Sequence, residues 1–193
     1  ECFDMALLRN FQARLAASGP GKLIVLHQKG SHGPSYFERS PAAFKQFLPE
    51  CTSNQLQRCS SAEITNAYDN SILYTDYVLS QLIAELKSSG DVDTAMLYVS
   101  DHGESLGENG FYLHGFPYAL APKEQTQIPM LLWMSDGFKQ RLNLDWDCLA
   151  DKRHALLSHD FLFSSVLALL DIKTQAANPQ LDFTAGCRPP KPV

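Results

Sequence analysis

A short apolar run that opens into a histidine- and glycine-rich loop is the feature that most limits what this chain can fold into. Residues 95–99 form this run, which predicts a buried strand over 95–101. Gly103, Gly107 and Gly110 follow, so the backbone is expected to turn sharply rather than continue as strand or helix. Because ligand sites in open α/β sheets lie beyond the carboxyl ends of strands, this loop is the first place to look for a site.

The same loop carries the side chains that a divalent metal requires. It contains Asp101, His102, Glu104 and His114. Carboxylate and imidazole groups together suit Zn²⁺ above other metals. The plainer alternative is that the Asp-His pair only caps a turn, with the aspartate bonding backbone amides. Glu104, His114 and a second histidine-bearing strand end favour the metal site over the turn cap.

The second strand end lies upstream. Residues 22–28 contain a continuous apolar run, which predicts a strand buried on both faces of a parallel sheet. Glycines and a proline follow it and indicate an abrupt turn. His32 lies in that turn and can reach a cleft. His27 is still inside the predicted strand and is explained more simply as a hydrogen-bonded core histidine.

The remaining pattern is that of an α/β domain. Apolar periodicity predicts helices over 3–17, over about 61–88 and over 160–170, the last of them buried. Ser60 or Ser61 can cap the long helix, and Glu63 completes a capping box. A further strand is expected over 128–134, a short helix over 42–47 and a loop over 171–193. This order predicts a mostly parallel sheet flanked by helices.

Composition excludes some classes of partner. The chain has 193 residues, of which 45% are hydrophobic, enough for one domain with a real core. The formal net charge is -5 and there is no basic stripe, so we expect no nucleic-acid partner. No apolar run reaches membrane-spanning length. The first residues look like the middle of a domain, so we expect the chain to be a piece of a longer protein.

The five cysteines form no Cys-x-x-Cys pair. Cys51 and Cys59 flank a polar segment, which predicts a loop closed by a disulfide. Cys148 and Cys187 lie in turn-rich surroundings and could pair, which would leave Cys2 with a partner elsewhere. The alternative is five free thiols in a cytosolic protein, but the pattern favours an oxidising compartment.

Taken together, the motifs resemble one enzyme family. Their order and spacing are similar to those of the lipid A phosphoethanolamine transferases, which include the mobile colistin-resistance enzymes and belong to the alkaline phosphatase/sulfatase superfamily. The similarity extends from residue 1 to about residue 170. It rests on five segments: Val25–Pro34, Tyr68–Asn70, Ser100–Gly110, Tyr112–Gly115 and Gln127–Leu131.

The resemblance implies a role for each candidate site residue. Asp101 and His102 match two of the four ligands of the catalytic Zn²⁺. His32 and His114 match histidines that bind the phosphoethanolamine phosphate or accessory zinc ions, and that position the phosphoryl group or protonate the leaving oxygen. Glu104 lies beside the metal as a supporting carboxylate or an occasional ligand.

The resemblance also bears on the cysteines. Cys51 and Cys59 match a family disulfide, and Cys2 matches a cysteine whose partner lies upstream. The pairing of Cys148 with Cys187 follows only from the cysteines that are left over, because only some family members have cysteines there.

The family's remaining parts have no counterpart in this sequence. Its nucleophile is an upstream threonine, which with a glutamate completes the zinc ligands, and its transmembrane helices are N-terminal. Residues 1–193 are therefore expected to be the C-terminal portion of a single periplasmic catalytic domain, a partial domain that pairs with the upstream half. The implied donor is phosphatidylethanolamine and the implied acceptor lipid A, at the periplasmic face of the Gram-negative inner membrane. Transfer would mask the negative charge of lipid A and confer resistance to cationic peptides such as colistin.

Two other functions stay open at this point. The Asp-His pair is shared with sulfatases, phosphodiesterases and phosphoglycerol transferases of the same superfamily. These differ in the nucleophile, a formylglycine-precursor cysteine, a threonine or a serine, that lies outside this sequence. The third hypothesis is a noncatalytic zinc-binding or disulfide-stabilised domain.

Overall fold

The computed structural model describes residues 2–17, 21–90 and 92–188. They form two compact units. Unit 1 comprises residues 1–89 and 97–131, and unit 2 comprises residues 90–96 and 132–193. Each unit is described by itself below.

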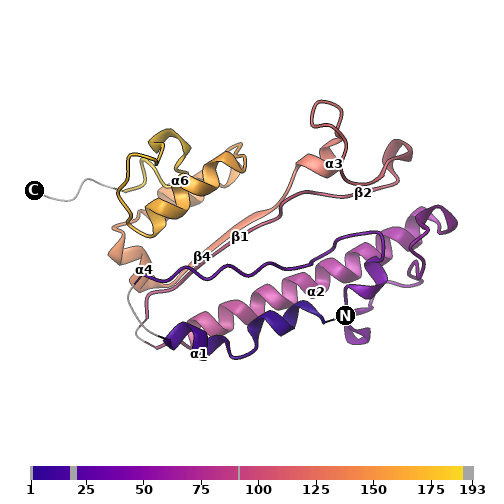
Figure 1. The fold of residues 1–193 in the computed structure, drawn as a ribbon, viewed down its shortest axis with the longest axis horizontal. Helices are drawn as coiled ribbons and strands as arrows, with labels where there is room; N and C mark the ends of the chain where they lie inside the picture. The colour runs from indigo at the N-terminus through magenta and orange to yellow at the C-terminus, as the bar shows by residue number, and fades with distance from the viewer. Residues whose placement is uncertain (1, 18–20, 91, 189–193) are drawn as a thin grey trace, which may run out of the picture. The chain divides into compact units, whose positions relative to one another are not determined.

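The long helix α2, Ser61–Lys87, is the largest element of unit 1 (Figure 1). Its first turn has the predicted capping box: the Ser60 hydroxyl accepts a hydrogen bond from the Glu63 amide, and the Glu63 carboxylate accepts one from the Ser60 amide at 2.7 Å. These bonds satisfy amides that have no partner within the helix. The 3-10 turns Asp4–Leu8, Tyr36–Glu38 and Ala42–Phe44 pack against α2.

The helix predicted over 3–17 is broken in the structure. A 3-10 turn, Asp4–Leu8, is followed by the short helix α1, Phe11–Ala16. Asn10 between them has a φ of 55°, a left-handed conformation that a continuous helix does not allow but that asparagine tolerates. The apolar spacing therefore predicts helical structure correctly, but the structure divides it into two short helical segments. The sequence Ser18–Gly21 predicts the end of this helix, and residues 18–20 of it lie outside the described residues.

The strand predicted over 22–28 is wrong for the described structure. The segment carries no strand pairing, and Leu23 and Val25 are 60% and 80% exposed. An extended segment becomes a strand only when a neighbour supplies ladder hydrogen bonds, and no described strand does so. The expected burial on both faces fails for the same reason.

Two strand pairs are formed. Strands β1, Ala95–Val99, and β4, Met130–Met134, are neighbours. In unit 1 the Ser100 amide donates to the Pro129 carbonyl, and in unit 2 the Ser135 amide donates to the Thr94 carbonyl, which is antiparallel register. Strands β2, Ser105–Leu106, and β3, Tyr112–Leu113, are also antiparallel. Both pairs formed by the described strands are thus antiparallel, and no parallel neighbour of the predicted sheet occurs among them.

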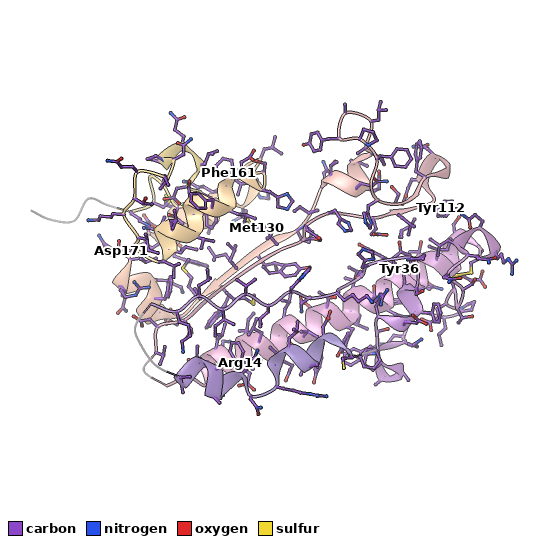
Figure 2. The ribbon with its side chains drawn as sticks, viewed as in Figure 1. Arg14, Tyr36, Tyr112, Met130, Phe161 and Asp171 are labelled. Atoms are coloured by element: carbon purple, nitrogen blue, oxygen red, sulfur yellow. A yellow bond between two sulfur atoms is a disulfide. The ribbon has the colours of Figure 1, made fainter. Side chains whose placement is uncertain are left out.

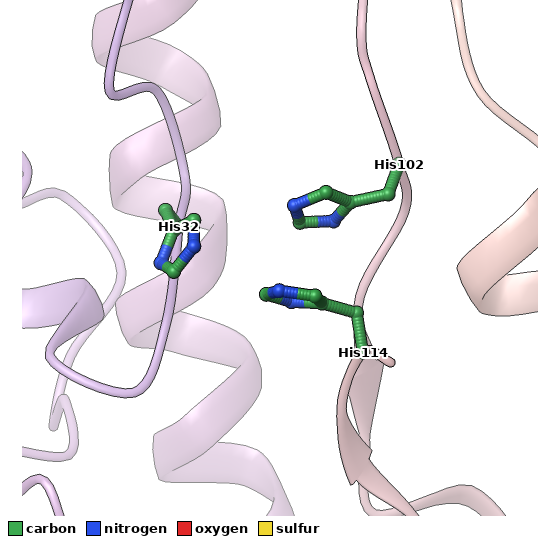
Figure 3. Close-up of side chains that lie close together, drawn as sticks. All are labelled: His32, His102 and His114. Carbon is green, nitrogen blue, oxygen red and sulfur yellow. The ribbon is translucent and has the colours of Figure 1, made fainter. Parts of the chain in front are cut away.

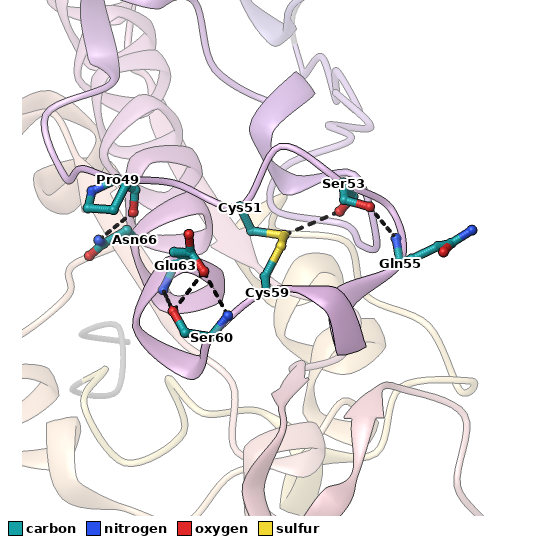
Figure 4. The surroundings of a disulfide bond; sticks show 8 residues. All are labelled: Pro49, Cys51, Ser53, Gln55, Cys59, Ser60, Glu63 and Asn66. Atoms are coloured by element: carbon teal, nitrogen blue, oxygen red, sulfur yellow. Dashed lines mark hydrogen bonds between the residues drawn. A yellow bond between two sulfur atoms is a disulfide. The ribbon is translucent and has the colours of Figure 1, made fainter.

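One core cluster of unit 1 contains the buried Tyr36, which Figure 2 labels. The other buried members of the cluster are Cys51, Leu56, Ile64 and Ala67. Cys51 forms a disulfide with Cys59, as predicted, directly before the cap of α2 (Figure 4). The disulfide therefore closes the loop that leads into the long helix. The remaining elements of unit 1 are the short helix α3, Lys123–Thr126, and the 3-10 turns Leu56–Arg58 and Glu108–Gly110.

Unit 2 is mainly helical and contains the second disulfide. Cys148 pairs with Cys187, whereas Cys2 of unit 1 is a free, exposed thiol. The helices are α4, Asp136–Arg141; α5, Trp146–Asp151; and α6, Asp160–Leu169, with 3-10 turns at Lys152–His154 and Pro179–Leu181.

The prediction that α6 is a buried helix is wrong. Phe163 is 59% exposed, whereas Ser164 and Ser165 are buried. The two serines face inward because their hydroxyls bond the following segment: Ser164 accepts from the Asn178 amide and Ser165 from the Phe183 amide. Within the described residues, no helix is both long and apolar enough to cross a bilayer.

Candidate metal centre

Three histidines far apart in the sequence meet in unit 1. His32, His102 and His114 each place a ring nitrogen within 4.8 Å of the others (Figure 3). His32 comes from the turn after the extended segment 22–29, His102 from the loop after β1 and His114 from the residue after β3. The rings of His102 and His114 stack with centroids 3.7 Å apart, and His32 meets His114 edge-on at 5.0 Å.

The same nitrogen of each ring is held by an oxygen. His32 Nδ1 lies 2.8 Å from the Gly33 carbonyl, and His102 Nδ1 lies 2.9 Å from the Gly103 carbonyl. His114 Nδ1 lies 2.5 Å from Glu104 Oε1. Carbonyl and carboxylate oxygens only accept, so the neutral form of each ring has its hydrogen on Nδ1 and its lone pair on Nε2.

This donor set fits zinc. Three imidazole rings each place a nitrogen within 4.8 Å of the others, and each Nδ1 lies against an oxygen; such imidazoles are the ligand type and the supporting contact found in protein zinc sites. None of the three histidines is fully buried, so an ion and a substrate can reach them.

Register explains how Glu104 and His114 meet. In the β2–β3 pair, Ser105 is opposite Leu113. One further step along this antiparallel ladder places Glu104 opposite His114. The short β2–β3 pair therefore fixes a carboxylate against an imidazole across the loop.

A buried tyrosine completes this contact. Tyr36 donates its hydroxyl hydrogen to Glu104 Oε2 at 2.5 Å, while Oε1 faces His114. Tyr36 is 1% exposed and Glu104 is also buried. Burial, and next the hydrogen bond to Glu104, raise the pKa of the Tyr36 phenol far above its usual value, so the hydroxyl remains a donor.

Asp101 lies beside the cluster rather than in it. Its Oδ1 accepts a hydrogen bond from the His102 amide, which is the turn-capping contact expected from the plainer interpretation. The same oxygen lies 3.9 Å from His102 Nε2, and the side chain is 81% exposed. Two ligands of one tetrahedral zinc are roughly 3.3 Å apart at ordinary bond lengths. The observed 3.9 Å is longer than that spacing, and Asp101 is not part of the three-histidine group.

The structure brings together most of the residues that sequence reasoning selected. His32, His102, His114 and Glu104 are in direct or adjacent contact, whereas His27 is exposed and outside the cluster. Sequence reasoning missed Tyr36. It lies in an irregular, proline-flanked segment, and the only signal was its position four residues after His32.

The chain is similar to known proteins over nearly its whole length. The family model described as sulfatase matches residues 1–172. The chain belongs to the sulfatase family. The soluble domain of lipooligosaccharide phosphoethanolamine transferase A from Neisseria meningitidis superposes with a TM-score of 0.95 and 44% identity, over 98% of this chain and 57% of that one. The predicted fold class, a partial sulfatase-like α/β domain, is thereby confirmed.

Two curated relatives match this chain at a similar level of sequence identity. Phosphoethanolamine transferase EptA of Salmonella typhimurium is 43% identical over 190 residues, which are 97% of this chain and 35% of the relative. Phosphatidylethanolamine transferase Mcr-1 of Escherichia coli is 41% identical over 185 residues, 95% of this chain and 33% of the relative. The resemblance predicted from the motifs is confirmed. The chain spans about a third of the length of these relatives.

Proposed function

We propose that this chain is the C-terminal part of a zinc-dependent phosphoethanolamine transferase. The observation that carries the proposal is the convergence of His32, His102 and His114, in a sulfatase-family chain 43% identical to a phosphoethanolamine transferase. The complete protein would move phosphoethanolamine from phosphatidylethanolamine to lipid A. Donor and acceptor are supported by the names of the relatives, which include a phosphatidylethanolamine transferase and a lipooligosaccharide phosphoethanolamine transferase.

Each residue of the centre has a distinct task in this proposal. His102 offers Nε2 and Asp101 its carboxylate to Zn²⁺, while His32 and His114 hold the phosphoryl group or an accessory zinc ion. Zinc in such a site polarises phosphoryl oxygens and activates a hydroxyl nucleophile. Glu104 keeps the hydrogen on Nδ1 of His114, so the opposite nitrogen stays available.

The setting of the proposed enzyme is the periplasmic face of the Gram-negative inner membrane. Disulfides form and persist in oxidising compartments, and both Cys51–Cys59 and Cys148–Cys187 are formed. The proposed partners are the upstream half of the catalytic domain, which supplies the nucleophile, and N-terminal membrane helices. Because the transferred group is cationic, the modified lipid A would bind colistin less well.

The test is His102→Ala in the complete protein, with His154→Ala as the control. His154 is an exposed histidine of unit 2, outside the metal centre. Transfer is measured by mass spectrometry of lipid A after incubation with phosphatidylethanolamine and zinc. We expect His102→Ala to abolish zinc-dependent transfer and His154→Ala to retain it. Unchanged transfer in His102→Ala would rule out the proposed centre.

A further inference from the structure

We propose that Tyr36 is a positioning residue that holds both histidine-bearing loops of the metal centre in register. The inference rests on the proposed function in the form in which His114 holds an accessory zinc ion, and it adds a residue to that site. Tyr36 would contact neither metal nor substrate. It would act on His114 through Glu104 and on the His32 turn through direct packing.

The first contact fixes the carboxylate. Glu104 is buried and has two oxygens, of which Oε2 accepts from the Tyr36 hydroxyl and Oε1 faces His114 Nδ1. His102 Nδ1 lies 3.9 Å from the same Oε1, so the carboxylate has a second imidazole toward which it could turn. The hydrogen bond from the Tyr36 hydroxyl therefore holds Glu104 in the orientation in which its Oε1 contacts His114 Nδ1.

The second contact fixes the His32 turn. A Cβ built on Gly33 would lie 2.6 Å from the Tyr36 hydroxyl oxygen and 2.6 Å from Leu113 Cδ2. The backbone next to His32 therefore rests directly on the phenol, at a distance that only glycine allows. Leu113 precedes His114. The contacts of Gly33 with Tyr36 and Leu113 therefore join the residues next to His32 and His114, two of the three histidines.

The tyrosine itself is held rigidly. Its ring packs in the core of unit 1 with Ile64 and Ala67 of α2 and edge-on to Tyr68, with ring centroids 5.5 Å apart. A side chain fixed in this way can transmit the position of the long helix to both loops. Groups that support metal ligands from behind typically change metal affinity 10- to 100-fold when removed.

The experiment is zinc titration of the complete protein after chelator treatment, by competition with a chromophoric chelator. Tyr36→Phe removes only the hydroxyl. Tyr74→Phe is the matched control, because Tyr74 is also buried and its hydroxyl accepts a hydrogen bond from the Met5 amide, 3.4 Å away. We expect Tyr36→Phe to weaken zinc binding about tenfold and Tyr74→Phe to leave it unchanged.

A double-mutant cycle separates positioning from general destabilisation. In a His114→Ala background, Tyr36→Phe should have a smaller effect on zinc affinity, because only its contact with the His32 turn is left to act. Equal effects in both backgrounds, or zinc affinity unchanged in Tyr36→Phe, would overturn the inference while leaving the proposed function standing. Failure of the unmodified protein to bind zinc would overturn both.

A second variant covers the case in which Tyr36→Phe does not fold. Gly33→Ala keeps the tyrosine but adds a Cβ that would lie 2.6 Å from its hydroxyl oxygen, so the hydroxyl must move. We expect the same loss of zinc affinity, and normal affinity in a folded Gly33→Ala protein would overturn the inference.

Discussion

At the scale of single residues, Gly103 holds the loop after β1 against α3. Its amide donates to the Gln125 carbonyl at 3.0 Å, and a Cβ at this position would lie 2.1 Å from the Glu124 carbonyl oxygen. A backbone oxygen cannot move aside as a flexible side chain can. The loop that carries His102 and Glu104 therefore depends on the absence of a side chain here.

We predict that Gly103→Ala destabilises the protein by about 3 kcal/mol, because α3 must shift to relieve the overlap. The comparison is Gly110→Ala in the same loop, where a Cβ meets nothing and only the positive φ of 81° adds strain, about 1 kcal/mol. Urea unfolding of the two variants measures both values. A Gly103→Ala variant as stable as Gly110→Ala would contradict this close packing.

The residues of the site differ in how far sequence could predict them. The histidines and Glu104 were predictable because glycine-rich turns after apolar runs are a local signal. Tyr36 was not, because its partner Glu104 is 68 residues away and nothing in the local pattern points to it. The fine position of Asp101, exposed and bonded to the next amide, also required the structure.

At the scale of elements, the capping box makes the start of α2 sensitive to acid. Hydrogen bonds from the Ser60 amide and hydroxyl lower the pKa of Glu63 below its ordinary value of 4.5. A carboxylate whose folded pKa is lowered contributes stability that is fully present above the unfolded pKa. That contribution is lost as pH falls through the folded pKa.

We therefore predict that the free energy of unfolding falls as pH drops below about 4.5, and that Glu63→Gln reduces this dependence. Asp76→Asn is the control, since Asp76 is an exposed acid of the same helix outside its cap. Denaturant unfolding from pH 6 to pH 3 measures the slopes. An identical slope in Glu63→Gln and the parent protein would show that the cap does not couple to pH.

The two disulfides should contribute unequally. Cys51–Cys59 spans 8 residues and Cys148–Cys187 spans 39. Loop-closure entropy predicts about 2.6 kcal/mol for the first and about 4 kcal/mol for the second. Denaturant unfolding of the two double-alanine variants checks the order. Each disulfide has one buried cysteine, Cys51 or Cys187, so the two variants should lose similar amounts of side-chain packing. A larger loss for Cys51/Cys59 would contradict the loop-length argument.

The elements also show why local patterns succeed or fail. The bounds of α2 were predictable because the residues that form its cap, its apolar face and its end all lie in or next to the helix in the sequence. The strand over 22–28 was not, because a strand requires a partner and apolar residues alone do not supply one. The apolar residues of α6 predict a buried helix. The structure differs because hydrogen bonds from the amides of Asn178 and Phe183, in the segment that follows the helix, hold Ser164 and Ser165 inward.

At the scale of the whole molecule, the extended segment 22–29 leaves an apolar stretch uncovered in unit 1. Leu23 and Val25 are exposed although they alternate with half-buried Ile24 and Leu26. Long exposed apolar segments mark surfaces that pair with another element. We expect upstream residues of the complete protein to pair with it.

Amide hydrogen exchange tests this expectation. In the isolated 193-residue chain, the amides of residues 23–27 should exchange rapidly, and in the complete protein they should be protected by strand pairing. Rapid exchange in both proteins would mean that the segment stays unpaired. Protection in the isolated chain would contradict the described conformation.

In the proposed enzyme, His102 and Asp101 hold zinc next to His32 and His114. The most direct measurement is an anomalous difference map, collected on either side of the zinc absorption edge, from crystals of the complete protein grown with zinc. We expect a peak at bonding distance from Nε2 of His102, with His32 and His114 facing the same ion or a second one. A fully occupied zinc elsewhere, with no peak at these three rings, would contradict it.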